Sequence, residues 1–133
     1  MFHLGAMKEF DAAPESFDLS LCIGASHAFG TYRDALRGLR RLLRPGGLAL
    51  VGDGYWRRTP AAEYLALLGA TPDEMTDHAG NVAAAIEEGF TPLYSCTASE
   101  DDWDHCRAAE GRASRLGTHL RTILTPVSDV IRV

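Results

Sequence analysis

The chain has 133 residues, of which 46% are hydrophobic and 23% are charged, and its formal net charge at pH 7 is -5. These values are ordinary for one globular domain spanning residues 1–133. The negative charge argues against nucleic acid as a partner, and no apolar run approaches the roughly 20 residues of a membrane span. Three widely spaced cysteines fit neither a zinc pattern nor a disulfide framework, so we expect a cytoplasmic protein.

The first predicted element is a strand within SFDLSLCIGA, a short apolar run bounded by Pro14 and Gly24. A continuous run of this kind is typical of a strand in a buried parallel sheet, and we expect Cys22 to be a small buried residue in it. From Thr31 to Arg44 the apolar residues recur at helical spacing, and RPGG ends the helix. The segment LALVGDGYW predicts a second strand. Strand, helix and strand in this order predict a βαβ unit with parallel strands.

The densest basic segment is RDALRGLRRLLRPGG, which carries five arginines on the predicted helix opposite its leucines. We interpret these arginines as a solvated helix face rather than as a nucleic-acid surface. Further helices are predicted within AAEYLALLG and HAGNVAAAIEEGF, and Val82 and Ile86 share a face of the second one.

The rest of the chain predicts two strands and one more helix. FTPLYSCTAS is the first strand, and Pro92 places it at a sheet edge or beside a bulge. Ser99 and Asp102 form a capping box for a helix that extends to about Leu116. The final segment, THLRTILTPVSDVIRV, predicts a helical turn and a short strand.

Small and polar residues follow both strands of the βαβ unit. In open α/β sheets ligands bind beyond the carboxyl ends of the strands, where small residues let a ligand approach the backbone. The first strand is followed by Gly24, Ala25 and Ser26, and the second ends in Gly52, Asp53, Gly54, Tyr55 and Trp56.

Together, FDLSLCIGASHAFG, the amphipathic helix and LLRPGGLALVGDGYW resemble the middle of a class I S-adenosylmethionine-dependent methyltransferase. In that family a fourth strand is followed by a helix, a Leu-x-Pro-Gly-Gly turn and a fifth strand. The resemblance covers roughly residues 17–105. It implies an α/β fold with a partial Rossmann-like sheet and flanking helices, in which this chain is the C-terminal part of the domain.

The resemblance implies S-adenosylmethionine as the cofactor. The family's glycine-rich loop and ribose-binding acid belong to earlier strands, and the chain contains no Gly-x-Gly-x-x-Gly segment. We therefore expect this chain alone to bind the cofactor weakly or not at all. The remaining cofactor contacts implied by the resemblance are apolar or backbone contacts from Ala6, Met7, Ile23, Gly24, Ala25 and Phe29.

Four residues are candidates for the chemistry and for substrate binding. His27 is a candidate general base, because an imidazole titrates near neutrality, or it shapes the loop by hydrogen bonding. Asp53 orients a substrate amine or hydroxyl, or it is a turn residue without function. Tyr55 and Trp56 cover the substrate or pack under a helix. No metal is expected: SEDDWD reads as the start of a helix, and the remaining histidines lack ligand spacing and are expected at the surface (His3, His78, His105 and His119).

Two functions follow from these observations. The first is methyl transfer to a small-molecule or other nucleophile, by a chain that is incomplete or inactive alone. The alternative is a non-catalytic fragment that acts as an oligomerising interaction module or a partner subunit. Without the family's first strands, the flank of strand Asp18–Ile23 is exposed, and a bare apolar edge favours a homodimer.

Overall fold

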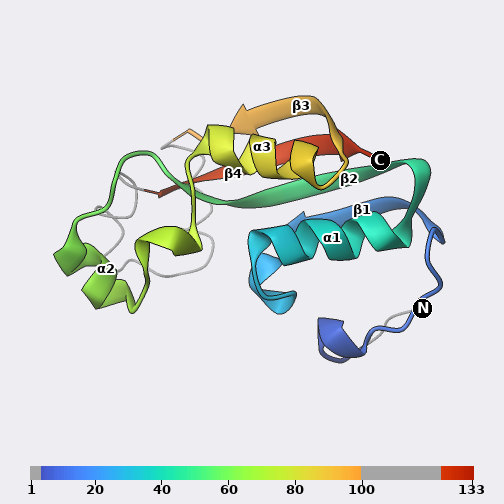
Figure 1. Cartoon of the computed structure of the whole chain (residues 1–133), viewed down its shortest axis with the longest axis horizontal. Helices are drawn as coiled ribbons and strands as arrows, with labels where there is room; N and C mark the ends of the chain where they lie inside the picture. The colour runs from blue at the N-terminus through green and yellow to red at the C-terminus, as the bar shows by residue number, and fades with distance from the viewer. Residues whose placement is uncertain (1–3, 100–123) are drawn as a thin grey trace.

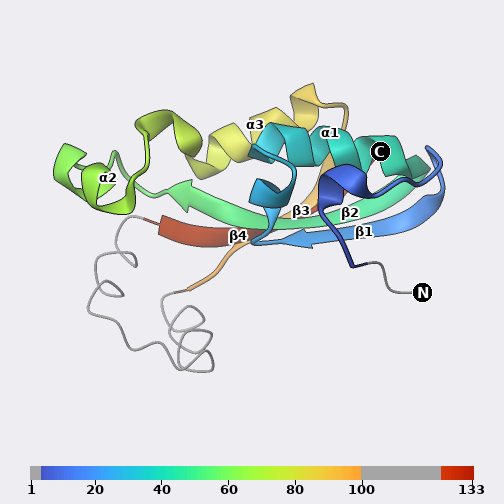
Figure 2. The same cartoon turned by 90° about the horizontal axis from the view of Figure 1, so that it is seen from below.

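A computed structural model describes residues 4–99 and 124–133, which form a mixed α/β structure (Figure 1). Its elements are η1 (Met7–Glu9), β1 (Phe17–Ile23), η2 (Ser26–Ala28), α1 (Tyr32–Leu42), β2 (Leu43–Trp56), α2 (Ala62–Leu68), η3 (Pro72–Glu74), α3 (His78–Glu87), β3 (Thr91–Thr97) and β4 (Leu124–Arg132). The predicted helix that follows Ser99 lies outside the described residues. Helices α1 and α3 lie on the same face of the sheet (Figure 2).

The sheet has the strand order β1-β2-β4-β3. β1 pairs in parallel with β2, whereas β4 runs antiparallel to both β2 and β3, so β1, β2 and β3 all point the same way. The predicted parallel pair crossed by a helix is therefore confirmed, as is the α/β fold with a partial Rossmann-like sheet. β3 is an edge strand whose register shifts between Pro92 and Tyr94, as the position of Pro92 predicted.

Helix α1 begins with a capping box formed by Thr31 and Asp34. The Thr31 amide donates to Asp34 Oδ2 at 3.0 Å, and the Asp34 amide donates to Thr31 Oγ1 at 3.1 Å. Two free amides of the first turn are thereby satisfied. These hydrogen bonds lower the pKa of Asp34, with the Thr31 hydroxyl contributing most.

Two arginines of α1, Arg33 and Arg37, stay partly exposed, as expected of a solvated face, and they also pair with carboxylates at the end of α3. Arg37 donates to both carboxylate oxygens of Glu88, from Nε at 3.0 Å and from Nη2 at 2.9 Å. Arg33 donates to Glu87 Oε2 at 2.6 Å. Bidentate pairing of this kind fixes the relative orientation of the two side chains as well as pairing their charges. The contact between Arg37 and Glu88 therefore helps to align α1 with α3.

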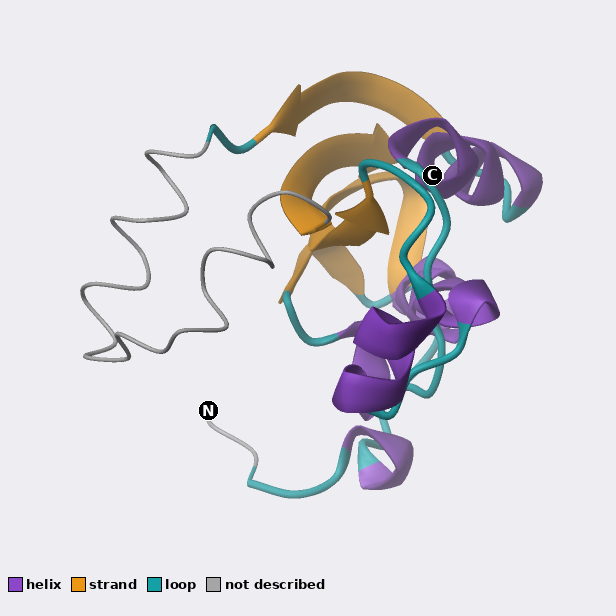
Figure 3. Ribbon diagram, turned by 90° about the vertical axis from the view of Figure 1, so that its left-hand side faces the viewer, coloured by secondary structure: helices purple, strands orange, loops and turns teal. Residues whose placement is uncertain are grey.

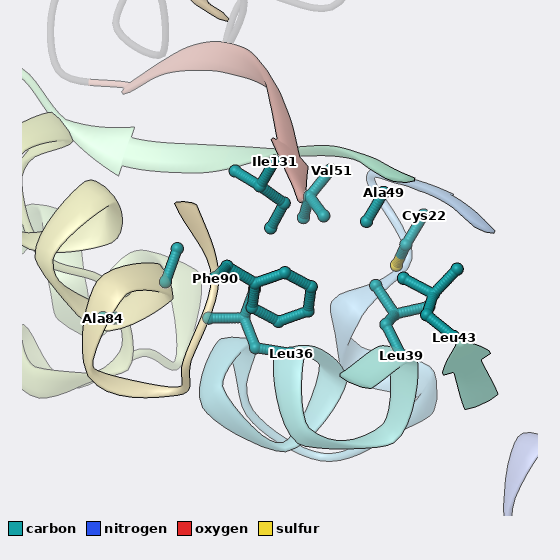
Figure 4. Packing of buried hydrophobic residues seen from close by; sticks show 10 residues of the cluster. Cys22, Leu36, Leu39, Leu43, Ala49, Val51, Ala84, Phe90 and Ile131 are labelled. Carbon is teal, nitrogen blue, oxygen red and sulfur yellow. The ribbon is translucent and has the colours of Figure 1, made fainter. Parts of the chain in front are cut away.

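The main core lies between the sheet and these two helices (Figure 4). Leu36 and Leu39 point from α1 toward the sheet, and Leu36 is completely buried. The cluster consists of Cys22, Leu36, Leu39, Leu43, Ala49, Val51, Ala84, Ala85, Phe90 and Ile131. The buried position of Cys22 is as predicted.

Helix α3 turns a face of small residues toward the core. Ala84 and Ala85 are buried, whereas Ile86 is 56% exposed and Val82 is half-buried. The predicted helix is present, and its inward face is formed by the two alanines rather than by Ile86. Phe90 belongs to the same cluster and occupies volume near α3, so small alanines suit the inward positions of the helix.

The described residues leave one face of the sheet uncovered along β1, and we call it the open face. Its exposed residues are Phe17, Leu19, Leu21 and Ile23 on β1 and Leu48 on β2. β1 is an edge strand of the described sheet, and both long helices lie on the opposite face, so only Cys22 of this strand is buried (Figure 3). The expectation of a fully buried strand is wrong in this structure, whereas the expected exposed edge is present.

Candidate functional site

The two parallel strands end in turns that are joined by a hydrogen bond. The Gly24 amide donates to the Gly52 carbonyl at 2.7 Å, which holds the end of β1 level with that of β2. Gly24 has φ +61°, a left-handed conformation that favours glycine. A Cβ built on Gly24 would meet no atom of the rest of the described chain within 4 Å, so the backbone here is open to a ligand.

The short helix η2 follows this turn and carries His27. Its backbone is held by hydrogen bonds from Ala28 to Ala25 at 3.0 Å and from Phe29 to Ser26 at 2.9 Å. His27 is exposed on η2, while Ala25 is half-buried and packs against the main core. Three predicted residues, His27, Gly24 and Ala25, therefore gather at the carboxyl end of β1.

Phe29 is used for packing. Its ring lies against Gly38 of α1, where an added Cβ would come within 2.6 Å of Phe29 Cε1. Phe29 also contacts the main core, so the ring anchors η2 to α1. The cofactor contact of Phe29 stays a prediction.

The other predicted cofactor residues lie apart from one another. Ile23 is 55% exposed at the end of β1 and belongs to the open face. Ala6 and Met7 start the short helix η1, where the Glu9 amide donates to the Ala6 carbonyl at 2.9 Å. Figure 1 draws this helix below α1, near the N-terminus.

Asp53 is half-buried at the end of β2, and its Oδ1 accepts a hydrogen bond from the Gly54 amide at 2.7 Å. Its charge also acts on Cys22. Burial is the main cause that raises the pKa of the Cys22 thiol, the Asp53 carboxylate raises it further, and a hydrogen bond with the Ala25 backbone opposes the shift. Cys22 is thus a protonated packing residue and not a thiolate nucleophile.

The two aromatic residues after Asp53 have different surroundings. Trp56 is 6% exposed, donates from Nε1 to the Pro72 carbonyl at 3.3 Å, and meets Tyr64 edge-to-face with ring centroids 6.4 Å apart. Of the two alternatives for Trp56, the structure shows packing under α2. Tyr55 is half-buried, and its ring lies 5.6 Å from that of His78.

The sequence interpretation missed His78, Ser95 and Asn81. His78 is half-buried, and its Nε2 lies 2.8 Å from Ser95 Oγ. Asn81 is 4% exposed and donates from Nδ2 to the Gly54 carbonyl at 3.3 Å, which ties α3 to the end of β2. A lone asparagine among alanines in HAGNVAAAI was a signal for a buried polar contact. No spacing rule joins Tyr55, His78 and Ser95, since they lie on three elements.

Within residues 4–99 and 124–133, no group of three or more His, Cys, Asp or Glu side chains is placed to hold a metal ion. The acidic segment SEDDWD lies outside the described residues beyond Ser99. No helix in the described part of the chain is both long and apolar enough to cross a membrane.

Comparison with known proteins agrees with this geometry. Residues 1–51, which include β1, η2, α1 and most of β2, match a family model described as a methyltransferase domain. The match covers less than half of the chain, and the fold as a whole is similar to that of solved S-adenosylmethionine-dependent methyltransferases. Among solved structures, a S-adenosylmethionine-dependent methyltransferase from Geobacter sulfurreducens in complex with S-adenosylhomocysteine has a TM-score of 0.78 and 21% identity. That alignment covers 98% of this chain and 63% of the other.

In sequence, the chain is similar to the uncharacterized protein YjhP of Escherichia coli, with 34% identity over 101 residues. The match covers 74% of this chain and 40% of the relative, so the chain spans less than half of that protein's length. The X-ray structure of YjhP aligns with a TM-score of 0.70 and 22% identity, over 88% of this chain and 59% of that one.

Proposed function

We propose that this chain supplies part of the site of a S-adenosylmethionine-dependent methyltransferase that acts on a small-molecule nucleophile. The observation that carries the proposal is the match of residues 1–51 to a methyltransferase domain, because this range contains the open turn at Gly24. The similar fold of the Geobacter sulfurreducens enzyme, solved with S-adenosylhomocysteine, supports the choice of cofactor.

The described residues offer some of the contacts that such a cofactor needs. The accessible backbone at Gly24 and the neighbouring Ala25 and Ile23 offer backbone and apolar contacts, and Ala6 and Met7 would add apolar contacts from η1. The chain's sequence contains no Gly-x-Gly-x-x-Gly segment for the methionine part, and the acid that binds the ribose hydroxyls in the family belongs to an earlier strand. The fit is therefore partial, and binding by this chain alone is weak.

When bound, S-adenosylmethionine would supply a methyl group activated by a sulfonium. The chain's own residues would then orient the acceptor, since alignment of the reacting atoms accounts for much of the acceleration in such transfers. Asp53 would accept a hydrogen bond from an acceptor amine or hydroxyl beside the end of β2. His27, exposed on η2, would take the proton that the acceptor loses.

Calorimetric titration with S-adenosylhomocysteine tests this proposal on two proteins. The first is this chain, and the second is a chimaera in which the part of the Geobacter sulfurreducens methyltransferase that the alignment leaves uncovered is joined to it. Two missing charged hydrogen bonds at about 1.5–3 kcal/mol each correspond to roughly two to four decades of affinity. We expect about millimolar or weaker binding by the chain and micromolar binding by the chimaera.

The result distinguishes the parts of the proposal. Low-micromolar binding by the chain alone would refute the incomplete site. A folded chimaera that does not bind S-adenosylhomocysteine would refute the cofactor itself.

The open face and the free edge of β1 favour a second candidate function, an interaction module that forms a homodimer through this edge. Leu21 is 64% exposed in the middle of β1, and a strand edge with apolar side chains readily pairs with another strand. Light scattering on the eluting protein would show a dimer that Leu21→Lys converts to a monomer. Leu67→Lys is the matched control, because Leu67 is 70% exposed on α2. A monomeric unmodified chain would refute this candidate.

We propose further that the partners do not include nucleic acid and that the protein is cytoplasmic. The ion pairs of Arg33 and Arg37 with Glu87 and Glu88 support the first statement, because they neutralise much of the basic segment. The three widely spaced cysteines, which fit no disulfide framework, support the second.

A further inference from the structure

Three side chains that the proposed methyl transfer has not yet used meet at the carboxyl end of the sheet. Tyr55 comes from β2, His78 is the first residue of α3, and Ser95 comes from β3. The His78 Nε2 and Ser95 Oγ atoms are 2.8 Å apart. The Tyr55 and His78 rings are 5.6 Å apart and inclined at 44°.

The strand register places this cluster on the helix-covered face. Ser95 and Val51 both pair with Asp129 of β4, so they occupy the same row of the sheet. Val51 is buried under the helices. Because side chains alternate along a strand, Asp53 and Tyr55 follow Val51 on the same face. The cluster therefore lies on the side of the sheet that also carries Asp53, at the end where ligands of open α/β sheets bind.

Backbone contacts hold the first turn of α3 against this end of β2. The Trp56 amide donates to the Thr76 carbonyl at 2.9 Å, and the buried Asn81 donates to the Gly54 carbonyl. Asp77 caps the helix by accepting from the Gly80 amide at 2.7 Å. His78 is thus positioned by contacts on both sides of it in the sequence.

The three groups remain accessible, since Tyr55 and His78 are half-buried and Ser95 is exposed. The imidazole and the hydroxyl can each donate or accept a hydrogen bond, and the Tyr55 ring offers an apolar face for a flat molecule. This combination suits a planar small molecule that carries a hydroxyl or an amine.

We propose that Tyr55, His78 and Ser95 bind the methyl acceptor, and that they select a flat molecule with a hydroxyl or amine. The assignment rests on the proposed methyl transfer, of which it names the acceptor class. His78 and Ser95 would hydrogen-bond the polar group, and Tyr55 would contact the flat part of the molecule.

Phenol and its O-methylated counterpart anisole form a matched pair of probes. Carbon-edited NMR of the histidine side chains of this chain, with the His78 signal assigned through His78→Gln, would follow each titration without cofactor. We expect phenol to shift the His78 signal and anisole to shift it much less. Loss of one hydrogen bond at about 0.5–1.5 kcal/mol predicts roughly two- to tenfold weaker phenol binding in Ser95→Ala.

Tyr94→Phe is the control variant, because Tyr94 is 61% exposed and precedes Ser95 on the other face of β3. It should bind phenol like the unmodified chain, and well-dispersed spectra would confirm that each variant is folded. The assignment is overturned if phenol leaves the His78 signal unchanged, if anisole binds equally well, or if Ser95→Ala has no effect. Since no cofactor is present, these outcomes are independent of S-adenosylhomocysteine binding.

Discussion

Replacement of Leu39 by alanine tests the packing of α1 on the sheet. Leu39 is 4% exposed and contacts the main core of the described structure (Figure 4). Its truncation removes buried methyl groups and leaves a cavity between α1 and β2, because the sheet is held in register by its hydrogen bonds. Leucine-to-alanine changes at such sites lower the free energy of unfolding by about 2–5 kcal/mol.

The matched control is Leu67→Ala on α2, where the same atoms are removed from a side chain that is 70% exposed. We expect its free energy of unfolding to change by no more than about 0.5 kcal/mol. Urea titrations monitored by circular dichroism give the free energy of unfolding of both variants. The comparison holds when the dependence of this free energy on urea concentration is the same in both. Equal losses in the two variants would show that Leu39 does not face the sheet.

Three further predictions concern the turn at Gly24 and the helix α1 that follows it. Gly24→Ala should lower the free energy of unfolding by about 1–2 kcal/mol through its positive φ without a steric clash, as a urea titration would measure. Gly38→Ala should displace Phe29 and cost about 1–3 kcal/mol in the same assay, and a smaller loss in a Phe29→Ala background would confirm the contact. The stability difference between the protein and Asp34→Asn should be present above about pH 4 and shrink as pH falls through the lowered pKa of Asp34; a constant difference would contradict the capping role.

Local patterns were sufficient to predict the βαβ unit. The apolar run ending at Ile23 and the helical spacing of Leu36 and Leu39 depend on neighbours in the sequence, and both elements form as expected. Pro92 likewise predicted an edge strand with a register shift, because proline cannot donate to a sheet ladder.

Features that depend on distant parts of the chain were not predicted. The inward face of α3 depends on Phe90 and the neighbouring core, and the exposure of Leu21 depends on which segments cover the sheet. Within the site, the turn at Gly24 could be predicted, because a glycine directly follows an apolar strand. The contact between Tyr55, His78 and Ser95 could not be predicted, because it depends on the register of β2, β4 and β3.

The position of β4 has a consequence for the order in which the sheet is made. β4 is the last element along the chain, yet it lies between β2 and β3 and provides the hydrogen bonds that join them. During synthesis, the βαβ unit of β1, α1 and β2 can form while the edge of β2 is still unpaired. β3, which pairs with β4 in this sheet, has to wait until residues 124–132 have left the ribosome. Until β4 is synthesised, β2 and β3 therefore each have an unpaired edge. Rapid pairing of β4 with both strands protects these edges from pairing with other chains.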